Sequence, residues 1–561
     1  MGQTPSPWTG KWAPTPRCAR SCAAALAAGP WMLVSDDHEV ANDYALDYES
    51  PVVATELVTS SISSQGPPQS SFDRWLRENP NVRRRALVRG GFARRCAVIT
   101  AMAIRTPPSM RAPLRLAAAA LAAFGCAAAF TSASQESTAV TPIIPYPTET
   151  RTLDNGLRLI VVPMPSDGLV AYWTIVRTGS RDEYEEGRSG FAHFFEHMMF
   201  RGTERYPADA YNRVITTIGA DANAYTTDDH TAYHLSMAAE DLEQVMDLES
   251  DRFKNLSYAE GAFQTEAGAV YGEYRKTRTE PEFALYEDLM AAAFERHPYG
   301  HTTLGYERDI AIMPSLYDYS REFFGRYYRP ENTVLFIAGD VTPANVWRLV
   351  EQYYGGWQRG YVPPRIPAEP EQTAERRVDV AYDGQTLPLL TVAYKLPVYD
   401  PADRTRVAAD LFADLAFGET SEAYRRLVLE EQLVEDLDAG ASYNRDPGLL
   451  EISARVKDAA KVDYVLGVID ETIARAKTEP PDAARVAALQ RRLRYAFLMG
   501  LQTPDSVASR VAQFVALSGD LEGLDRLHAT YAAVTPADVR TAAESYLRQE
   551  RRTVGVLRSR P

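Results

Sequence analysis

The sequence predicts an α+β fold of two homologous domains, each a mostly antiparallel sheet packed with helices, joined by a Pro-rich linker. Three observations support this fold class. Segments typical of strands and of helices alternate from Thr141 onward, a cluster of prolines interrupts them, and a stretch before the prolines recurs after them. A chain of 561 residues is long enough for two or three domains.

The elements of the first half are indicated by residue type and spacing. β-Branched and aromatic residues between turn signals predict strands at 155–164 (NGLRLIVVPM), 169–179 (LVAYWTIVRTG) and 332–341 (NTVLFIAGDV), the last of them buried. Apolar residues at helical spacing predict helices over 190–201, 207–218, 239–254, 262–278, 283–295 and 314–328.

The proline cluster marks the boundary between the two domains. Four prolines lie within ten residues at 361–370 (YVPPRIPAEP), a composition typical of a linker. We therefore expect a first domain over 141–358, a linker over 359–374 and a second domain over 375–561.

Short matches between the two halves predict an internal duplication. The segment ADLFADLAFGET at 409–420 aligns without gaps on AHFFEHMMFRGT at 192–203. Near the end of each half, NTVLFIAG and RTVGVLRS share a Thr-Val pair at a similar offset. The simplest interpretation is two copies of one α+β domain.

The residues before 134 differ from the rest of the chain. Arg111 and Arg115 precede an apolar run from Leu116 to Phe130, and small residues follow, which is the order of a secretory signal peptide. We expect a signal peptide over 110–133 that directs export. Its apolar run of about 15 residues is too short for a membrane-spanning helix. This prediction implies that the chain is exported to a periplasm-like compartment.

Residues 1–109 are expected to be a non-native or disordered N-terminal extension, because a signal peptide belongs at the start of a chain. Translation would then begin near Met102 or Met110. The alternative is a disordered extension that precedes a buried apolar helix.

Composition and cysteine count exclude several classes of protein. The formal net charge of −15 argues against a nucleic-acid binder, because neutralising phosphates requires clustered lysine and arginine. The acidic balance weakly favours basic peptides as substrates. No cysteine follows Cys126, so the globular part is expected to have no disulfide and no thiolate metal site. Cys18 and Cys22 could form half a zinc site, but no second pair follows them.

The stretch GFAHFFEHMMFRGT at 190–203 contains an H-x-x-E-H pattern formed by His193, Glu196 and His197. On a helix, residues four apart share one face, so both imidazoles can point at one metal ion. Glu196 then lies beside the metal, where it can take a proton from a metal-activated water. The alternative is an amphipathic helix on which Glu196 forms a surface pair.

The duplication separates this chemistry from the fold. In the second copy the helix is kept, but three residues of the pattern are replaced, so the fold does not require them. The replacements are Asp410 for His193, Ala413 for Glu196 and Asp414 for His197.

Several segments together resemble the pitrilysin/insulysin family of zinc metalloendopeptidases (the inverzincins). They are GSRDEYEEGRSGFAHFFEHMMFRGTERYP, GADANAYTTDDHTAYH, FQTEAGAVYGEYRK, HPYGHTTLGY and YYRPENTVLFIAGDV. The chain is most similar to the short-chain branch of the mitochondrial processing peptidase and its bacterial relatives. The resemblance extends over roughly residues 145 to 561 and is thinner in the second half.

The resemblance implies further site residues. It implies Glu273 as the third metal ligand and Glu266 as a residue that orients a ligand, although on their own both are ordinary charges of an amphipathic helix. It also implies that Asn223, Ala224 and Tyr225 lie on an edge strand that pairs with the peptide substrate. A core strand whose Asn caps a turn is the alternative.

One departure from the family pattern bears on partners. Active members carry an Arg and a Tyr seven residues apart, and Val428 and Glu435 stand at those positions here. Arg425, Arg426 and Tyr443 are candidates only if the alignment shifts. We therefore expect a heterodimer with a family member that supplies the Arg/Tyr pair, although a homodimer stays possible.

The sequence thus predicts a zinc-dependent endopeptidase with one Zn²⁺ per chain, acting on peptides or unfolded polypeptide segments. No nucleic acid and no stable membrane span of the mature chain are expected. A non-catalytic scaffold subunit is the alternative, and a purely structural zinc is a third reading that would leave Glu196 without a role. Manganese or cobalt could occupy the same ligands.

Overall fold

The computed structural model describes residues 141–560. The expectations for residues 1–109 and for the signal peptide at 110–133, like all four cysteines, lie outside the described residues. Among residues 141–560, no helix is long and apolar enough to cross a membrane.

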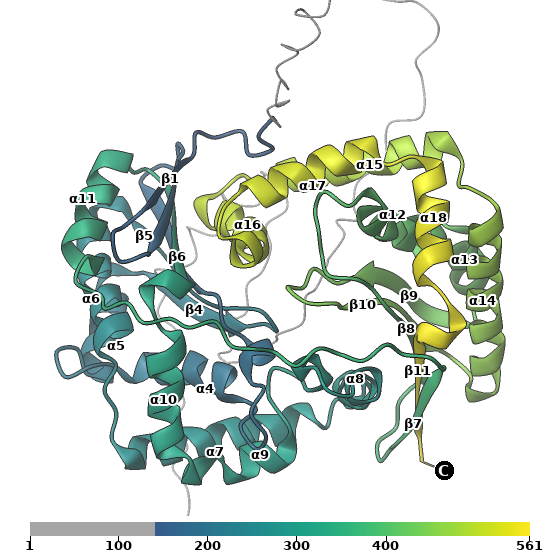
Figure 1. Ribbon diagram of the computed structural model, residues 1–561, viewed down its shortest axis with the longest axis horizontal. Helices are drawn as coiled ribbons and strands as arrows, with labels where there is room; N and C mark the ends of the chain where they lie inside the picture. The colour runs from purple at the N-terminus through teal and green to yellow at the C-terminus, as the bar shows by residue number, and fades with distance from the viewer. Residues whose placement is uncertain (1–140, 561) are drawn as a thin grey trace, which may run out of the picture. The chain divides into compact units, whose positions relative to one another are not determined.

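The first sheet has six strands in the order β1-β2-β6-β3-β5-β4 (Figure 1). Strands β2 and β6 run parallel, and every other neighbouring pair is antiparallel. Strand β4 therefore forms one edge of this sheet. The strands are β1 (Glu149–Thr152), β2 (Arg158–Pro163), β3 (Leu169–Val176), β4 (Asp221–Thr226), β5 (Thr231–Ala238) and β6 (Thr333–Gly339).

The second sheet repeats the topology of the first. Its order, β7-β11-β8-β10-β9, matches β2-β6-β3-β5-β4 strand for strand, and its one parallel pair, β7 with β11, matches β2 with β6. The predicted fold class of two homologous, mostly antiparallel α+β domains is confirmed. The strands are β7 (Arg376–Tyr382), β8 (Leu389–Lys395), β9 (Val434–Ala441), β10 (Leu449–Val456) and β11 (Arg552–Ser559).

The helices of the first half lie close to their predicted positions. The segment predicted as a helix over 190–201 ends its α-helical part at Met198 and continues as a 3-10 turn over Met199–Arg201. The helices are α4 (Phe191–Met198), α5 (Ala208–Ile218), α6 (Leu242–Asn255), α7 (Glu260–Thr277), α8 (Pro281–Ala293), α9 (Glu307–Ile312), α10 (Tyr317–Tyr327) and α11 (Pro343–Tyr354).

Between α11 and β7, residues 355–375 contain no helix or strand, and the predicted linker lies within this segment. A π-helical turn over Arg425–Glu430 follows the second helix of the second half. The helices of that half are α12 (Arg404–Phe417), α13 (Glu422–Tyr424), α14 (Val462–Thr478), α15 (Ala483–Met499), α16 (Pro504–Ser518), α17 (Glu522–Ala533) and α18 (Pro536–Tyr546).

Each half covers the outer face of the other half's sheet with one helix. Helix α16 packs against β3 and β6 of the first sheet, where Val511 shares an apolar cluster with Trp173. Helix α8 packs against β7 and β11 of the second sheet (Figure 1). Leu285 and Leu557 share an apolar cluster there. Burying these apolar faces joins the two halves, which belong to one compact unit.

Helix α4 lies in the core on the inner face of the first sheet. Phe191, Phe194, Phe195 and Met198 are fully buried, and Phe195 stacks on the ring of Phe323 with centroids 5.5 Å apart. Close packing of this kind fixes the rotation of the helix about its axis. It therefore also fixes the direction of the polar residues on its remaining face.

Candidate metal centre

Three potential metal ligands converge from two helices. His193 and His197 lie one turn apart on α4, and Glu273 lies on α7 beside them. Glu273 Oε2 is 3.7 Å from Nε2 of His193 and 3.4 Å from Nε2 of His197. One ligand atom from each residue lies within 4.8 Å of the other two. The structure thus brings together the three residues that the sequence and the resemblance had suggested as ligands.

The donor set fits zinc. Two neutral imidazole nitrogens and one carboxylate oxygen are the ligands of many catalytic zinc sites. Tetrahedral ligands at about 2.1 Å from a metal would be roughly 3.4 Å apart, close to the two separations from Glu273. His193 Nδ1 is buried and has no hydrogen-bond partner in residues 141–560. Three ligands leave one position of a tetrahedron open.

A hydrogen-bonded chain of side chains orients His197. Its Nδ1–H donates to Oε1 of the buried Glu266 at 3.0 Å, and Nε2 is thereby directed towards Glu273. The other carboxylate oxygen of Glu266 accepts from Nε of Arg201 at 2.6 Å. Carboxylates that hold metal-binding imidazoles in this way tune both orientation and basicity. Glu266 thus occupies the position expected of an orienting residue.

The two imidazoles have different protonation equilibria. Burial lowers the pKa of His193, so this ring is neutral near pH 7. Burial also lowers the pKa of His197, but its hydrogen bonds to Glu266 and Glu273 outweigh this and raise the pKa to about 10. In the metal-free chain a proton therefore resides on His197, between two carboxylates.

Glu196 lies on the same helix, buried, next to the edge strand β4. Its Oε2 accepts a hydrogen bond from Oγ1 of Thr226 at 2.7 Å. Thr226 is the last residue of β4 and pairs with Thr231 across the β4–β5 turn. Glu196 is not one of the three converging ligands, and its carboxylate is instead held by Thr226 of the edge strand.

The structure places the predicted substrate segment on the sheet edge. Asn223, Ala224 and Tyr225 are central residues of β4, whose neighbour within the described sheet is β5. The ring of Tyr225 packs edge-on against Trp173, and its hydroxyl contacts His230, so its side chain faces the α16 side of the sheet. Any contact of Tyr225 with a peptide beside α4 would therefore be through its backbone.

Two residues that hold parts of the site were not foreseen from the sequence: Glu183, at the start of α4, and Thr226, which binds Glu196. Glu183, fully buried, accepts hydrogen bonds from the backbone N–H groups of Gly190 and Ala192, both at 2.6 Å. Gly190, the N-cap, has φ of 90°, a conformation that glycine adopts without strain. A carboxylate at a helix N-terminus satisfies donors that lack intrahelical partners. Both residues lie in segments that resemble the family, Glu183 in GSRDE and Thr226 in NAYT. The resemblance was therefore the signal from which they could have been predicted.

The second half replaces the three-ligand site by an ion pair. Helix α12 connects the same two strand positions as α4, and α15 follows α14 as α7 follows α6. Asp414, at the position of His197, pairs with Arg492 of α15. Asp410, at the position of His193, accepts from the hydroxyls of Tyr443 and Tyr531, both at 3.0 Å. A guanidinium thus joins the two helices of the second copy, where the first copy has converging ligands.

The candidates for an Arg/Tyr pair are engaged elsewhere in the described part of the chain. Arg425 pairs with Glu430, Arg426 binds Glu431 and Glu471, and the buried hydroxyl of Tyr443 binds Asp410. The positions that align with the pair hold the half-buried Val428 and the exposed Glu435, which pairs with Arg455.

A polar contact between the halves is built on the turn that follows β4. Asp229 of this turn accepts from the Tyr299 hydroxyl at 2.8 Å and from the backbone N–H of Arg445 at 3.0 Å. The next residue, Asp446, accepts from Nε of Arg181 at 2.5 Å and from Nε2 of His297 at 3.1 Å. The β9–β10 loop thereby stabilises the turn that follows β4, the strand whose Thr226 binds Glu196.

We expect Asp446→Asn to lower the free energy of unfolding by about 1–2 kcal/mol at pH 7. Burial raises the pKa of Asp446, but hydrogen bonds from His297 and Arg181 lower it to about 2. A lowered carboxyl pKa stabilises the fold above the ordinary value near 4, and this is lost as the pH falls towards 2. Urea unfolding at several pH values measures the difference. Asp383→Asn, which removes an exposed pair with Arg560, is the control and should change little; equal losses in both variants would contradict the assignment.

Solved structures identify the class of fold. A protease from Helicobacter pylori superposes with a TM-score of 0.68 at 25% identity, covering 74% of this chain and 100% of that chain. A putative M16-like peptidase from Alicyclobacillus acidocaldarius superposes with a TM-score of 0.66 at 22% identity, covering 74% and 99%. The fold is that of M16-like peptidases with two homologous domains.

Sequence comparisons identify the family. The model of the insulinase family (peptidase family M16) matches residues 160–307, and the model of the M16 inactive domain matches residues 316–493. This chain belongs to peptidase family M16, so the resemblance seen in the sequence is confirmed.

The curated relatives are named as zinc proteases or as a processing peptidase. Zinc protease PqqE of Helicobacter pylori is 25% identical over 415 residues, which is 73% of this chain and 92% of that protein. The beta subunit of the mitochondrial-processing peptidase of Lentinula edodes is 24% identical over 414 residues, or 71% and 87%. Zinc is therefore the metal associated with the family.

Proposed function

We propose that this chain is a zinc-dependent endopeptidase that hydrolyses peptides or unfolded polypeptide segments. The observation that carries the proposal is the convergence of His193 Nε2, His197 Nε2 and Glu273 Oε2, with Glu196 buried on the same helix between the two histidines. These three residues would hold Zn²⁺. Because the three ligands and the candidate base are all present in this chain, the alternative of a non-catalytic scaffold subunit is less well supported.

Zinc bound by these ligands would polarise the peptide carbonyl and lower the pKa of a water molecule. Glu196 is the general base: its carboxylate takes a proton from the attacking water and delivers it to the leaving amide nitrogen. The hydrogen bond from Thr226 to Oε2 holds that carboxylate in place. Glu266 and Arg201 hold the His197 ring so that Nε2 stays directed at the ligand group.

Substrate is proposed to bind as an added strand on β4, along Asn223, Ala224 and Tyr225. Backbone pairing with a sheet edge binds an extended chain with little regard to its sequence. Because β4 ends at Thr226, which contacts Glu196, a peptide bond of the paired chain would lie next to the base. A folded protein could not present such a strand, which accounts for the proposed preference for unfolded segments.

Zinc binding is expected to release about one proton per chain at pH 7.5. His197, with a pKa of about 10, must lose its proton, whereas the lowered pKa values of His193 and Glu273 leave both ready to bind. Apparent zinc affinity should therefore rise about tenfold per pH unit between roughly pH 7 and 9. Calorimetry in buffers of different ionisation enthalpy counts the protons. Release should fall well below one in Glu266→Gln at pH 8.5, and no release in the wild type would contradict the assignment.

The function is tested by metal analysis and peptide cleavage on the same preparation. One zinc per chain, cleavage of quenched unstructured peptides and loss of cleavage on chelation would support the proposal. Resistance of the same sequences inside a folded domain would support the conformational filter. Bound zinc without cleavage, in any pairing with co-purified proteins, would favour the scaffold alternative.

We further propose that the active form is a heterodimer whose partner supplies the Arg/Tyr pair. Val428 and Glu435 stand at the corresponding positions, and the three nearby candidates have other contacts. One relative is named as a subunit of a processing peptidase. Full activity of the purified chain alone would contradict this proposal, whereas activity that appears only with a co-purified partner would support it.

Export and domain limits are also proposed. Residues 110–133 would direct the chain to a periplasm-like compartment and be removed, and residues 359–374 would join a catalytic domain to a non-catalytic one. N-terminal sequencing of the chain from fractionated cells tests the first of these. A mature N-terminus far upstream of residue 134 would contradict it.

A further inference from the structure

The β4–β5 turn, residues 227–230, is held on one side by the segment that follows β3. The backbone N–H of Arg181 donates to the backbone oxygen of Asp228 at 2.8 Å, and Ser180 Oγ donates to Asp228 Oδ1 at 2.9 Å. A Cβ at Gly179 would lie 2.2 Å from the backbone oxygen of Thr227, so only glycine permits this close approach. The first half thus provides one of the two surfaces between which the turn lies.

The other surface is the β9–β10 loop, residues 442–448, which extends from the second sheet to this turn (Figure 1). Asp229 is the turn residue that contacts it. Its Oδ2 accepts from the backbone N–H of Arg445 at 3.0 Å and from Nδ2 of Asn444 at 3.4 Å. The Arg445 guanidinium donates to the backbone oxygen of Arg177, the residue after β3, at 3.0 Å. The loop therefore binds the turn and the neighbouring strand end together.

Asp229 depends on the second half for most of its hydrogen bonds. Its side chain is 1% exposed, and burial raises its pKa, so hydrogen bonds must offset the loss of water around the carboxylate. Of the three groups within residues 141–560 that donate to it, two belong to the loop and the third is the Tyr299 hydroxyl at 2.8 Å. Without the loop the carboxylate would have to reach solvent, which requires the turn to move.

A movement of the turn would be transmitted to the candidate base. Thr226, three residues before Asp229, donates its hydroxyl to Glu196 Oε2 at 2.7 Å. The turn between them is short and closed, because the backbone N–H of Thr227 donates to the backbone oxygen of His230 at 2.8 Å. A displacement of about 1 Å at a catalytic group can lower a rate up to about 100-fold. The position of Asp229 therefore bears on the position of Glu196.

We propose that the second half positions the general base of the first half. The β9–β10 loop holds Asp229, Asp229 holds the turn, and the turn holds Thr226 against Glu196. Asp229, Asn444 and Arg445 are positioning residues in this account, and the second half acts in catalysis although it lacks the three converging ligands. The effect on rate rests on the proposed peptidase function, whereas the effect on the turn can be measured in a chain that cleaves nothing.

Hydrogen exchange followed by mass spectrometry measures the turn directly. Asp229→Ala should speed amide exchange about tenfold across residues 221–236, while α4 and α7 exchange as in the wild type. The double variant Asn444→Ala with Arg445→Ala should do the same, and it tests the contact from the other half even if Asp229→Ala does not fold. Unchanged exchange across 221–236 in the double variant, or faster exchange throughout both halves, would overturn the proposal.

The effect on catalysis is measured as a double-mutant cycle in zinc-loaded preparations that cleave a quenched peptide. Thr226→Val and Asp229→Ala should each lower kcat about tenfold, with zinc affinity and KM within about twofold of the wild type. Because both act through one hydrogen bond to Glu196, the two substitutions together should also lower kcat only about tenfold. If Asp229→Ala does not fold, the Asn444/Arg445 double variant takes its place in the cycle.

Three results of the cycle would overturn the positioning role. They are an unchanged kcat in Asp229→Ala, a loss of about 100-fold when both substitutions are combined, and a loss that falls on KM alone, which would assign the loop to substrate binding. If the wild type cleaves no peptide in any pairing, the peptidase function fails, and the exchange measurement still decides whether the loop holds the turn.

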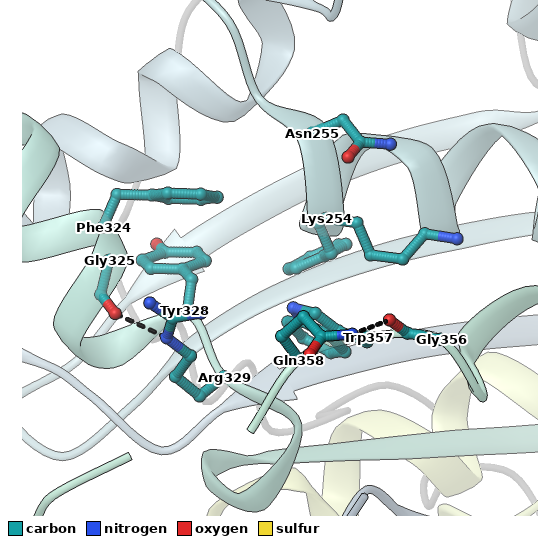
Figure 2. A pocket seen from close by; sticks show the side chains of 10 residues that line it. Lys254, Asn255, Phe324, Gly325, Tyr328, Arg329, Gly356, Trp357 and Gln358 are labelled. Carbon is teal, nitrogen blue, oxygen red and sulfur yellow. Dashed lines mark hydrogen bonds between the residues drawn. The ribbon is translucent and has the colours of Figure 1, made fainter. Parts of the chain in front are cut away.

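Lys254→Met is the matched control. Lys254 Nζ donates to the backbone oxygen of Tyr353 at 2.6 Å, so this variant also removes a hydrogen bond between two elements of the described chain. Lys254 lines the pocket of about 490 Å³ shown in Figure 2, and none of the residues lining that pocket belongs to the turn or to the β9–β10 loop. Exchange across 221–236 and kcat should both stay within about twofold of the wild type. A tenfold loss of kcat in Lys254→Met would overturn the specific role of Asp229.

Discussion

Replacing Glu196 with glutamine is expected to lower kcat about 10³-fold while one zinc per chain stays bound, because a positioned general base contributes roughly 10²–10⁴ to a rate. Glutamine has nearly the same size and its amide oxygen can still accept from Thr226, so the fold and the three ligands are retained. The amide cannot take a proton from water. Steady-state cleavage of a quenched peptide and metal analysis of the same sample provide the two readouts.

The control for this variant is Glu260→Gln, an exposed residue in the first turn of α7, which should leave kcat within twofold. A Glu196→Gln chain that keeps zinc and retains activity within tenfold of the wild type would remove Glu196 from the role of base. Loss of zinc together with activity would show instead that Glu196 contributes to metal retention.

Replacing Glu273 with glutamine is expected to have the second large effect, a loss of zinc affinity of more than 100-fold. The substitution removes the anionic ligand, whose Oε2 lies between the two imidazoles. Glu266 contacts His197 at Nδ1, not at the nitrogen proposed to bind zinc. Glu266→Gln should therefore lower zinc affinity 10–100-fold, the range for residues that orient a ligand. Competition with a chelator of known affinity gives both values at one pH.

The order of these two effects is the informative result. If Glu273→Gln retained zinc within tenfold of the wild type, another residue would have to be the third ligand. If Glu266→Gln lowered zinc affinity more than Glu273→Gln did, the roles of the two glutamates would be exchanged. Circular dichroism of both variants checks that the overall helical content of the chain is unchanged.

Much of the first half was predictable because local patterns there agree with the fold. The strand at 169–179 and the helix at 207–218 each have one residue period and clear turn signals, and both formed within a few residues of their predicted limits. The duplication was also visible in short matches, and the strand orders of the two sheets confirm it.

The exchange of helices between the halves could not be predicted in the same way. Periodicity indicates that a helix such as α16 has an apolar face, but not which sheet that face covers. The pairing of Val511 with Trp173 depends on chain topology, which places helix and strand side by side although they are far apart in sequence. Local sequence patterns therefore do not predict which sheet each of these helices covers.

The candidate site, too, was predictable only in part from local sequence patterns. The four-residue spacing of His193 and His197 predicts, from helix geometry alone, that both imidazoles share one face with Glu196 beside them. Glu273 needed the resemblance, because nothing local relates α7 to α4. Thr226, which holds Glu196, was missed because its contact forms only when β4 becomes the sheet edge beside α4.

The most direct test of the central claim is anomalous X-ray scattering from crystals of the zinc-loaded chain, measured on both sides of the zinc absorption edge. We predict one strong anomalous peak per chain, about 2.0–2.2 Å from His193 Nε2, His197 Nε2 and a carboxylate oxygen of Glu273. A zinc peak at other residues, or no peak in the loaded crystal, would contradict the assignment of these three ligands.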